Sequence, residues 1–282
     1  MEKKVGLIVA WVFGYLCTTS AFAALTVADL PTAGGVLQDK TIYMVKKNKY
    51  LTGVNSSALV VASNAEVVIY ISAGVSLTCN GADASSHLNP GQPGILLPKG
   101  STLYVTGAGY LTASGGCAGN GEDGTVGGRA FLEGSYPNRS MTMYGGIGGE
   151  GGNGGAGAGA GIGTSGGKGG NGGGPGGQVH GVCGYVPEGF TYGSRGEDGN
   201  SGASSADVGD VYILGSVSAC SFAGKAGAAG AGGSKQDQGS YVYFTVSSGG
   251  TKYVTGGDGG GGGGGAGGDG GLYSWITKRQ PK

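Results

Sequence analysis

The chain has 282 residues, 71 of them Gly, and carries 17 Lys plus Arg against 17 Asp plus Glu, which gives a formal net charge of zero. Charged residues make up only 12% of the sequence, so the basic surface needed to bind phosphate backbones is missing and nucleic acid is not an expected partner. The hydrophobic content of 38% argues against an intrinsically disordered chain, because such chains combine low hydrophobicity with high net charge.

Residues 1–23 have the features of a signal peptide. Two lysines, Lys3 and Lys4, precede the apolar stretch Val5 to Leu16, and the small-residue site Ala21-Phe22-Ala23 follows it. This pattern predicts export, a mature chain that starts near Ala24, and a secreted or cell-surface location. The apolar stretch is too short to cross a bilayer stably, and no later apolar run reaches about 18 residues, so no membrane span is expected after signal removal.

Cleavage would remove Cys17 and leave an even set of cysteines in an exported chain. The remaining four are Cys79, Cys117, Cys183 and Cys220. They are candidates for two disulfides, for which three connectivities exist, and the alternative is that they are buried free thiols.

Residues 24–57 are expected to form an N-terminal cap with a first strand at Thr41 to Val45, and residues 58–257 a glycine-rich solenoid. Between Ala58 and Gly81, three short β-rich runs are separated by turn residues, which predicts one three-sided coil. The runs are Leu59 to Val61, Val67 to Ile71 and Val75 to Cys79. In the second run, Val67, Ile69 and Ile71 should face the core, and Val68 and Tyr70 should face the other way.

A short apolar-Tyr-apolar phrase recurs along the chain, which is typical of a repeat protein that coils and stacks on itself. Its tyrosines are Tyr43, Tyr70, Tyr104, Tyr212 and Tyr243. If the phrases stack in register, these side chains form one column and are candidate ligand-binding residues. The alternative is that the glycine tracts cover the column, which then serves only stability.

Longer versions of the phrase strengthen the prediction of stacked coils. They span Ser101 to Gly115, Gly209 to Ala223 and Tyr241 to Gly257. Weaker coils are expected at Met141 to Met143 and at Val182-Cys183.

Two tracts are almost pure glycine, Gly145 to Gly177 and Gly256 to Gly271. Their three-residue period suits polyglycine-II strands, which become ordered only when packed against neighbours. The alternative is a pair of mobile loops. Residues 258–282 hold the end of the second tract and a segment, Leu272 to Ile276, expected to cap the stack or to form an assembly contact.

Residues that could carry chemistry are few and scattered. His87 and His180 have no neighbouring partner motif, and the spacings of zinc sites are absent, so neither a metal nor a cofactor is expected. Gly-Glu-Asp-Gly occurs at 121–124 and at 196–199 and is interpreted as a solvated turn rather than a calcium site. An enzyme would need a convergent group of carboxylates, from the candidates Asp83, Asp123, Asp198, Asp207 and Asp210.

The phrases "STLYVTGAGYLTASGGCAGNG" and "GAGAGAGIGTSGGKGGNGG" resemble the glycine-rich repeats of extracellular right-handed β-helix proteins of the pectin-lyase-like superfamily. The Gly-Gly-x triplets are also similar to the polyglycine-II tips of phage tail adhesins and to glycine-rich antifreeze proteins. We therefore expect an all-β, single-stranded β-solenoid (β-helix) with long glycine-rich insertions.

The function expected from these observations is that of a secreted or cell-surface, non-catalytic structural or adhesive protein. Its expected partners are a glycan or another cell-surface protein, and self-association is compatible with the pattern. Two alternatives stay open: a carbohydrate- or ice-binding module that uses a flat Tyr/Thr face, and a polysaccharide-active β-helix lyase or hydrolase.

Overall fold

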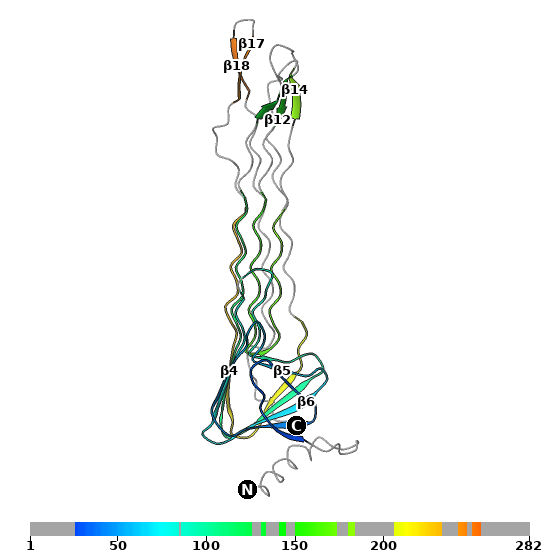
Figure 1. Ribbon diagram of the computed structural model, residues 1–282, viewed down its shortest axis with the longest axis vertical. Coiled ribbons are helices and arrows are strands. Elements are labelled where there is room, and N and C mark those ends of the chain that lie inside the picture. The colour runs from blue at the N-terminus through cyan, green and yellow to red at the C-terminus, as the bar shows by residue number, and fades with distance from the viewer. Residues whose placement is uncertain are drawn as a thin grey trace.

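The computed structural model describes residues 26–84, 86–125, 131–133, 141–144, 150–173, 180–183, 206–232, 242–246 and 250–254. Within these ranges the secondary structure consists of strands, with no helix. Three parallel sheets form a β-solenoid at one end of the molecule, and a long glycine-rich arm extends from it (Figure 1). The predicted all-β solenoid fold is confirmed.

Each of the three parallel sheets takes one strand from each turn of the chain. Sheet A has the order β1 (Thr26–Asp29), β3 (Thr41–Val45), β6 (Glu66–Ile71), β9 (Thr102–Gly107) and β15 (Asp210–Ile213). Sheet B has the order β13 (Ile162–Gly163), β8 (Ile95–Leu96), β5 (Leu59–Val61) and β2 (Gly35–Leu37). Sheet C has the order β16 (Ser218–Phe222), β10 (Tyr110–Ser114), β7 (Ser76–Asn80) and β4 (Lys49–Thr52).

From β3 onward, the strands of these three sheets follow one another along the chain in the order A, C, B. The three runs predicted between Ala58 and Gly81 are β5, β6 and β7, one in each sheet, so the predicted three-sided coil is confirmed. The two longer phrases that begin at Ser101 and Gly209 also stack as predicted, because β9 pairs with β15 and β10 pairs with β16 in parallel register.

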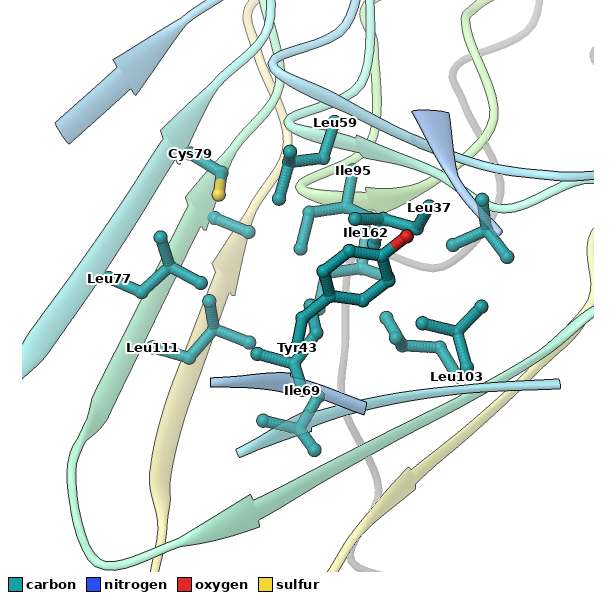
Figure 2. Close-up of a cluster of buried hydrophobic side chains, with 14 of the residues drawn as sticks. Leu37, Tyr43, Leu59, Ile69, Leu77, Cys79, Ile95, Leu103, Leu111 and Ile162 are labelled. Carbon is teal, nitrogen blue, oxygen red and sulfur yellow. The ribbon is translucent and has the colours of Figure 1, made fainter. Parts of the chain in front are cut away.

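The core lies between the inner faces of the three sheets (Figure 2). Val67, Ile69 and Ile71 of β6 are fully buried there, as their alternation predicts. They meet inward aliphatic side chains of the other sheets, such as Leu77 of β7 and Ile95 of β8. A leucine or isoleucine buried in this way contributes about 1.5–3 kcal/mol of transfer free energy, so the stacked aliphatic columns are the main support of the solenoid.

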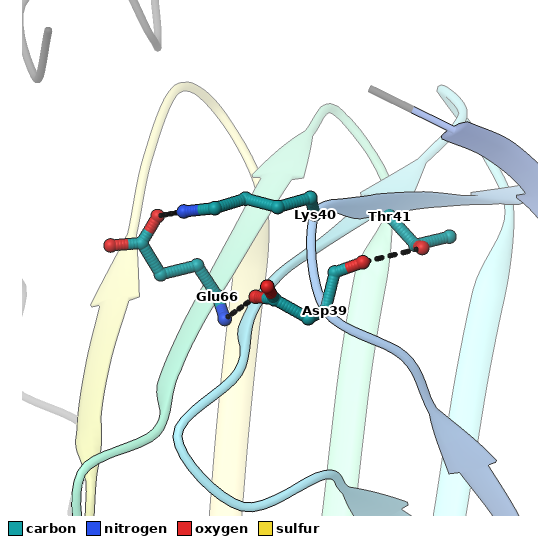
Figure 3. Close-up of polar contacts among 4 residues, drawn as sticks. All are labelled: Asp39, Lys40, Thr41 and Glu66. Atoms are coloured by element: carbon teal, nitrogen blue, oxygen red, sulfur yellow. Dashed lines mark hydrogen bonds and ion pairs between the residues drawn. The ribbon is translucent and has the colours of Figure 1, made fainter. Parts of the chain in front are cut away.

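The corner that leads into sheet A is tied across successive coils by polar contacts (Figure 3). Asp39 Oδ1 accepts the backbone N–H of Glu66 at 2.8 Å, and the hydroxyl of Thr41 donates to the carbonyl oxygen of Asp39 at 3.0 Å. Lys40 forms an ion pair with Glu66. Lys40 itself has a φ of 52°, in the left-handed region, so these contacts hold an uncommon backbone turn in place.

Two further sheets are antiparallel and stand apart from the solenoid. One contains β11 (Phe131–Glu133), β12 (Met141–Tyr144) and β14 (His180–Cys183), and the other is the hairpin of β17 (Val242–Val246) and β18 (Gly250–Val254). In Figure 1, β12, β14, β17 and β18 lie at the far end of the arm. The predictions of weaker coils at Met141 and Val182, and of a third full coil from Tyr241, are therefore wrong.

Four extended segments of the glycine-rich arm lie within the described residues and run side by side. We name them segment a (115–125), segment b (150–161), segment c (164–173) and segment d (223–232). Segment b hydrogen-bonds to all three of the others. The N–H of Ala156 donates to the carbonyl of Gly119 in segment a, and the N–H of Gly154 donates to the carbonyl of Gly170 in segment c. From segment d, the N–H of Gly227 donates to the carbonyl of Ala156. Segment b runs antiparallel to its three neighbours, and segments a and d run parallel to each other.

Hydrogen bonds between these segments repeat every three residues. Between segments b and d they run from Gly224, Gly227 and Gly230 to the carbonyls of Gly159, Ala156 and Asn153, at 3.0, 2.9 and 2.8 Å. Polyglycine-II strands have three residues per turn and are predicted to bond in this way. Residues 150–173 are thus an ordered part of the fold and not a mobile loop. The second tract, Gly256 to Gly271, and the segment Leu272 to Ile276 lie outside the described residues.

Glycine is required at the positions that face a neighbouring backbone directly, because no space is left there for a side chain. A Cβ added to Gly121 would lie 1.9 Å from the carbonyl oxygen of Asn153, and one added to Gly227 would lie 1.9 Å from that of Gly119. Real Cβ atoms do not approach so closely. In segment d the inward position recurs every third residue as Gly224, Gly227 and Gly230, and the positions between them are exposed.

Candidate functional site

The predicted column of five tyrosines does not form. In sheet A, Tyr43 pairs with Ile69 and points into the core, where its hydroxyl oxygen accepts the N–H of Gln38 at 2.8 Å. Tyr70 is aligned with Met44 and Thr106, two residues along the strand from the column that holds Tyr104. Tyr243 lies in β17 of the antiparallel hairpin. The expected single register is therefore wrong.

Among the predicted tyrosines whose side chains the structure describes, Tyr104 and Tyr212 stack on each other. Their ring centroids are 5.3 Å apart with an interplanar angle of 18°. Tyr104 is 6% exposed and forms an outer cluster with Ile42 and Val68, against which Tyr70 and Tyr212 pack half-buried. Burial, with smaller contributions from Glu66, Tyr212 and Asp210, raises the pKa of Tyr104 to about 12. This cluster supports sheet A by packing, and it is not a bare aromatic face.

A different surface presents exposed aromatic rings. The outward side chains of sheet C form a grid, which we name the sheet C face. Three columns run across its strands: Ser76, Tyr110 and Ser218; Tyr50, Thr78, Thr112 and Cys220; Thr52, Asn80, Ser114 and Phe222. The intervening residues point inward, with Leu77, Cys79, Leu111 and Ala113 fully or almost fully buried.

The sheet C face combines aromatic rings with neutral hydrogen-bonding groups. Tyr50 is 72% exposed, and Tyr110 and Phe222 are each 55% exposed. The Nδ2 amide of Asn80 donates to the hydroxyl of Tyr50 at 2.6 Å, which orients that ring across two strands. None of its positions carries a charged side chain. Its chemistry is therefore that of stacking and neutral hydrogen bonding.

Sequence reasoning missed this face because its aromatic residues lie outside the apolar-Tyr-apolar phrase. Tyr50 follows a lysine, Tyr110 follows a glycine, and Phe222 stands between Ser221 and Ala223. A usable signal was present in β10, where Tyr110, Thr112 and Ser114 alternate with the inward Leu111 and Ala113. That alternation marks an outward polar and aromatic face.

The carboxylates that would have to converge in an enzyme make separate contacts. Asp83 Oδ1 accepts the backbone N–H of Cys117, and Asp123 Oδ1 accepts that of Ala231, at 2.6 and 2.8 Å. Asp207 forms an exposed ion pair with Lys99 at 2.5 Å, in which the hydrogen bond lowers the pKa of Asp207 and raises that of Lys99. Asp210 lies at the start of β15, and Asp198 lies outside the described residues.

Asp123 belongs to the first Gly-Glu-Asp-Gly, which lies in the extended segment a, so the predicted solvated turn is wrong for this copy. The Asp123 carboxylate accepts the N–H of Ala231 and adds to the hydrogen bonding between segments a and d. The second copy lies outside the described residues. Over the parts of the chain that the structure describes, no three His, Cys, Asp or Glu side chains gather as a metal site would require. His87 is 7% exposed, and its Nδ1 has no hydrogen-bond partner among the described residues.

The predicted disulfides do not form among Cys79, Cys117 and Cys220, which are all free. Cys79 points into the core from β7, and Cys220 is exposed on the outward side of β16, so the two thiols lie on opposite faces of sheet C. Burial raises the pKa of the Cys79 thiol to about 12. Of Cys183 the structure describes only its position at the end of β14.

The chain matches no protein-family model, and no curated protein or solved structure shows significant similarity to it. Among the described residues there is no helix with the length and apolar character needed to cross a membrane.

Proposed function

We propose that this chain is a secreted or cell-surface, non-catalytic protein with a structural or adhesive role. In this proposal the β-solenoid is the base, and the glycine arm holds distal contact elements away from it. The signal-peptide pattern of residues 1–23 supports export. The recurrent strand phrases and glycine triplets support a relation to extracellular β-helix proteins of the pectin-lyase-like superfamily.

The observation that carries this proposal is the packing of the glycine arm. Segments a to d are joined by backbone hydrogen bonds at three-residue spacing, and at glycines such as Gly121 and Gly227 they approach too closely for a side chain. A rise of about 3.1 Å per residue gives segment a an extension of roughly 30 Å. A stem held together along its length in this way resists bending, and it can present a tip at a fixed distance from its base.

The test is an adhesion measurement with the full exported chain coupled to beads. The quantity measured is the fraction of beads retained under flow on surfaces coated with cell-surface glycans or proteins. Two matched variants are compared with the wild type: Gly227→Ala, which disturbs the arm, and Ala226→Ser, which changes an exposed neighbour. The proposal predicts retention of wild-type and Ala226→Ser beads and weaker retention of Gly227→Ala beads. Absence of retention on every surface, or lyase or hydrolase turnover of pectic polysaccharides by the intact chain, would reject it.

A second candidate function, carbohydrate or ice binding by a flat face, is favoured by one specific observation. The sheet C face is a regular parallel β-surface with exposed Tyr50, Tyr110 and Phe222 and neutral side chains between them. A thermal-hysteresis measurement in parallel with a polysaccharide-binding assay separates the two ligands, since only an ice binder arrests crystal growth.

A further inference from the structure

We propose that the sheet C face is a binding site for a neutral polysaccharide. This inference rests on the second candidate function, carbohydrate binding by the sheet C face, and names the ligand class and the residues that take it. Three features of the face carry the argument: its exposed aromatic rings, its lack of charge, and the position of the rings around a polar centre.

The exposed rings give the face its apolar contact area. Tyr50, Tyr110 and Phe222 stand on three different strands and are at least half exposed. Aromatic side chains in such positions have large apolar faces that bind the C–H surface of a flat ring, and a tyrosine adds a hydroxyl for hydrogen bonding. A sugar ring offers both an apolar C–H surface and hydroxyl groups at its edge, and it matches this combination.

The rings are spaced for an extended ligand. Neighbouring strands lie roughly 4.8 Å apart and residues two apart in a strand roughly 6.6 Å apart, which separates the three aromatic positions by roughly 12–16 Å. A single small ring cannot reach two of them. An extended chain that crosses the strands can contact two of the three positions, which form a triangle, so a polysaccharide fits better than a monosaccharide.

The lack of charge selects against acidic and basic partners. Every outward position from Ser76 to Phe222 in the three columns is hydroxyl, amide, thiol or aromatic. Without a cation the face has nothing to neutralise a uronate, a sulfate or a phosphate backbone. Threonine and serine hydroxyls and the Asn80 amide can instead exchange hydrogen bonds with the hydroxyls of a neutral sugar.

The arrangement of the rings argues against a second copy of the chain as the occupant. Interfaces between proteins have an apolar, aromatic centre and a polar rim. The sheet C face has the reverse order: Tyr50 and Phe222 lie on the two edge strands β4 and β16, and Thr78 and Thr112 occupy the centre. A polar centre with aromatic margins suits a ligand that carries hydroxyls along its whole length.

The pairing of Tyr50 with Asn80 indicates that the face is preorganised. The hydrogen bond of 2.6 Å between these side chains joins β4 to β7, and the two strands are also held by parallel backbone pairing. A rigid platform loses little conformational entropy when a ligand binds, which strengthens binding by a shallow surface.

The test is affinity electrophoresis of the full chain through gels that contain a soluble neutral β-glucan, galactomannan or dextran, with polygalacturonate as the acidic comparison. We expect retardation by at least one neutral polysaccharide and none by polygalacturonate. Each of Tyr50→Ala, Tyr110→Ala and Phe222→Ala should weaken binding roughly three- to tenfold, as loss of an aromatic contact predicts. Tyr110→Phe keeps the ring and should lose less than Tyr110→Ala.

The control is Val54→Ala, which shortens a side chain that is 82% exposed and lies outside the sheets. It should bind like the wild type, and all variants should stay folded at the temperature of the assay, which circular dichroism checks. Three results would overturn the inference: no retardation by any neutral polysaccharide, equal retardation of wild type and the triple alanine variant, or a wild-type dimer that the triple variant converts to monomer. If no neutral polysaccharide retards the wild type but its beads are still retained under flow, this inference fails while the adhesive function stands.

Discussion

Replacing one inward glycine of the arm by alanine tests whether backbone contacts hold the arm together. The substitution is Gly227→Ala, chosen because its N–H donates to the carbonyl of Ala156 at 2.9 Å and its added Cβ would lie 1.9 Å from the carbonyl oxygen of Gly119. The nearest atoms belong to the backbone, so the clash cannot be relieved by turning a side chain. Segments a and d must move apart locally.

The expected cost follows from two effects. Overpacking of a tightly packed contact costs about 1–3 kcal/mol, and a buried backbone group that loses its partner costs a further 1–3 kcal/mol. We therefore expect a loss of about 2–6 kcal/mol in the stability of the arm. In a flexible, open loop the same change would have the opposite sign, because alanine restricts the unfolded chain and stabilises by about 0.4–1 kcal/mol.

Native-state hydrogen exchange is the assay, because it reports the arm separately from the solenoid. In the variant, protection should fall at the amides of Gly224, Gly227 and Gly230, which bond to segment b, and stay unchanged at Ile69 in β6. The control Ala226→Ser alters an exposed neighbour in the same segment and should leave the pattern unchanged. Unaltered or increased protection in Gly227→Ala would refute the close packing of segments a, b and d.

Three further predictions concern the solenoid. Tyr43→Phe removes the acceptor of the Gln38 N–H and should lower the free energy of unfolding by about 1–3 kcal/mol, as measured by chemical denaturation. The control Tyr212→Phe, on the outer face of sheet A, should lower it less, and equal losses would contradict the inward position of Tyr43. Ile69→Ala should lower the free energy of unfolding by about 2–5 kcal/mol in the same assay, because truncating a fully buried side chain leaves a cavity. A loss below about 1 kcal/mol would contradict the position of Ile69 in the core. Burial raises the pKa of Cys79 from 9.0 and that of Tyr104 from 10.0, each to about 12. Both groups therefore ionise at lower pH in the unfolded chain than in the folded one, and the free energy of unfolding should fall between pH 9 and 12. Cys79→Ala should flatten the part of this slope above pH 9, and an unchanged slope would count against burial of the thiol.

Local sequence was sufficient to predict the repeating unit of the fold. The alternation in Val67 to Ile71 fixed which side chains face the core, because successive residues of a strand point to opposite sides. The turn residues between β5, β6 and β7 separated the three sides of one coil. The three-residue glycine period also anticipated the spacing of hydrogen bonds in segments b and d.

The position of Tyr43 could not be predicted from the sequence. In β3, Thr41, Tyr43 and Val45 form one set, and Ile42 and Met44 form the other, so both sets contain apolar residues and either can face the core. Pairing with β6 decides between them, since a shift of one residue moves every side chain to the opposite face. The sheet C face was missed for a different reason: its aromatic residues stand on β4, β10 and β16, which share one sheet only in the tertiary structure.

The sequence by itself determined the elements of this protein: short strands with an aliphatic inward side, tight turns between them, and glycine at three-residue spacing. These follow from local sterics and side-chain periodicity. The tertiary structure alone decided the pairing register, the antiparallel sheets beyond the arm, and the separation of Cys79 from Cys220 across sheet C. The physical reason is that pairing and packing depend on residues far apart in the chain, and several alignments satisfy the local pattern equally well.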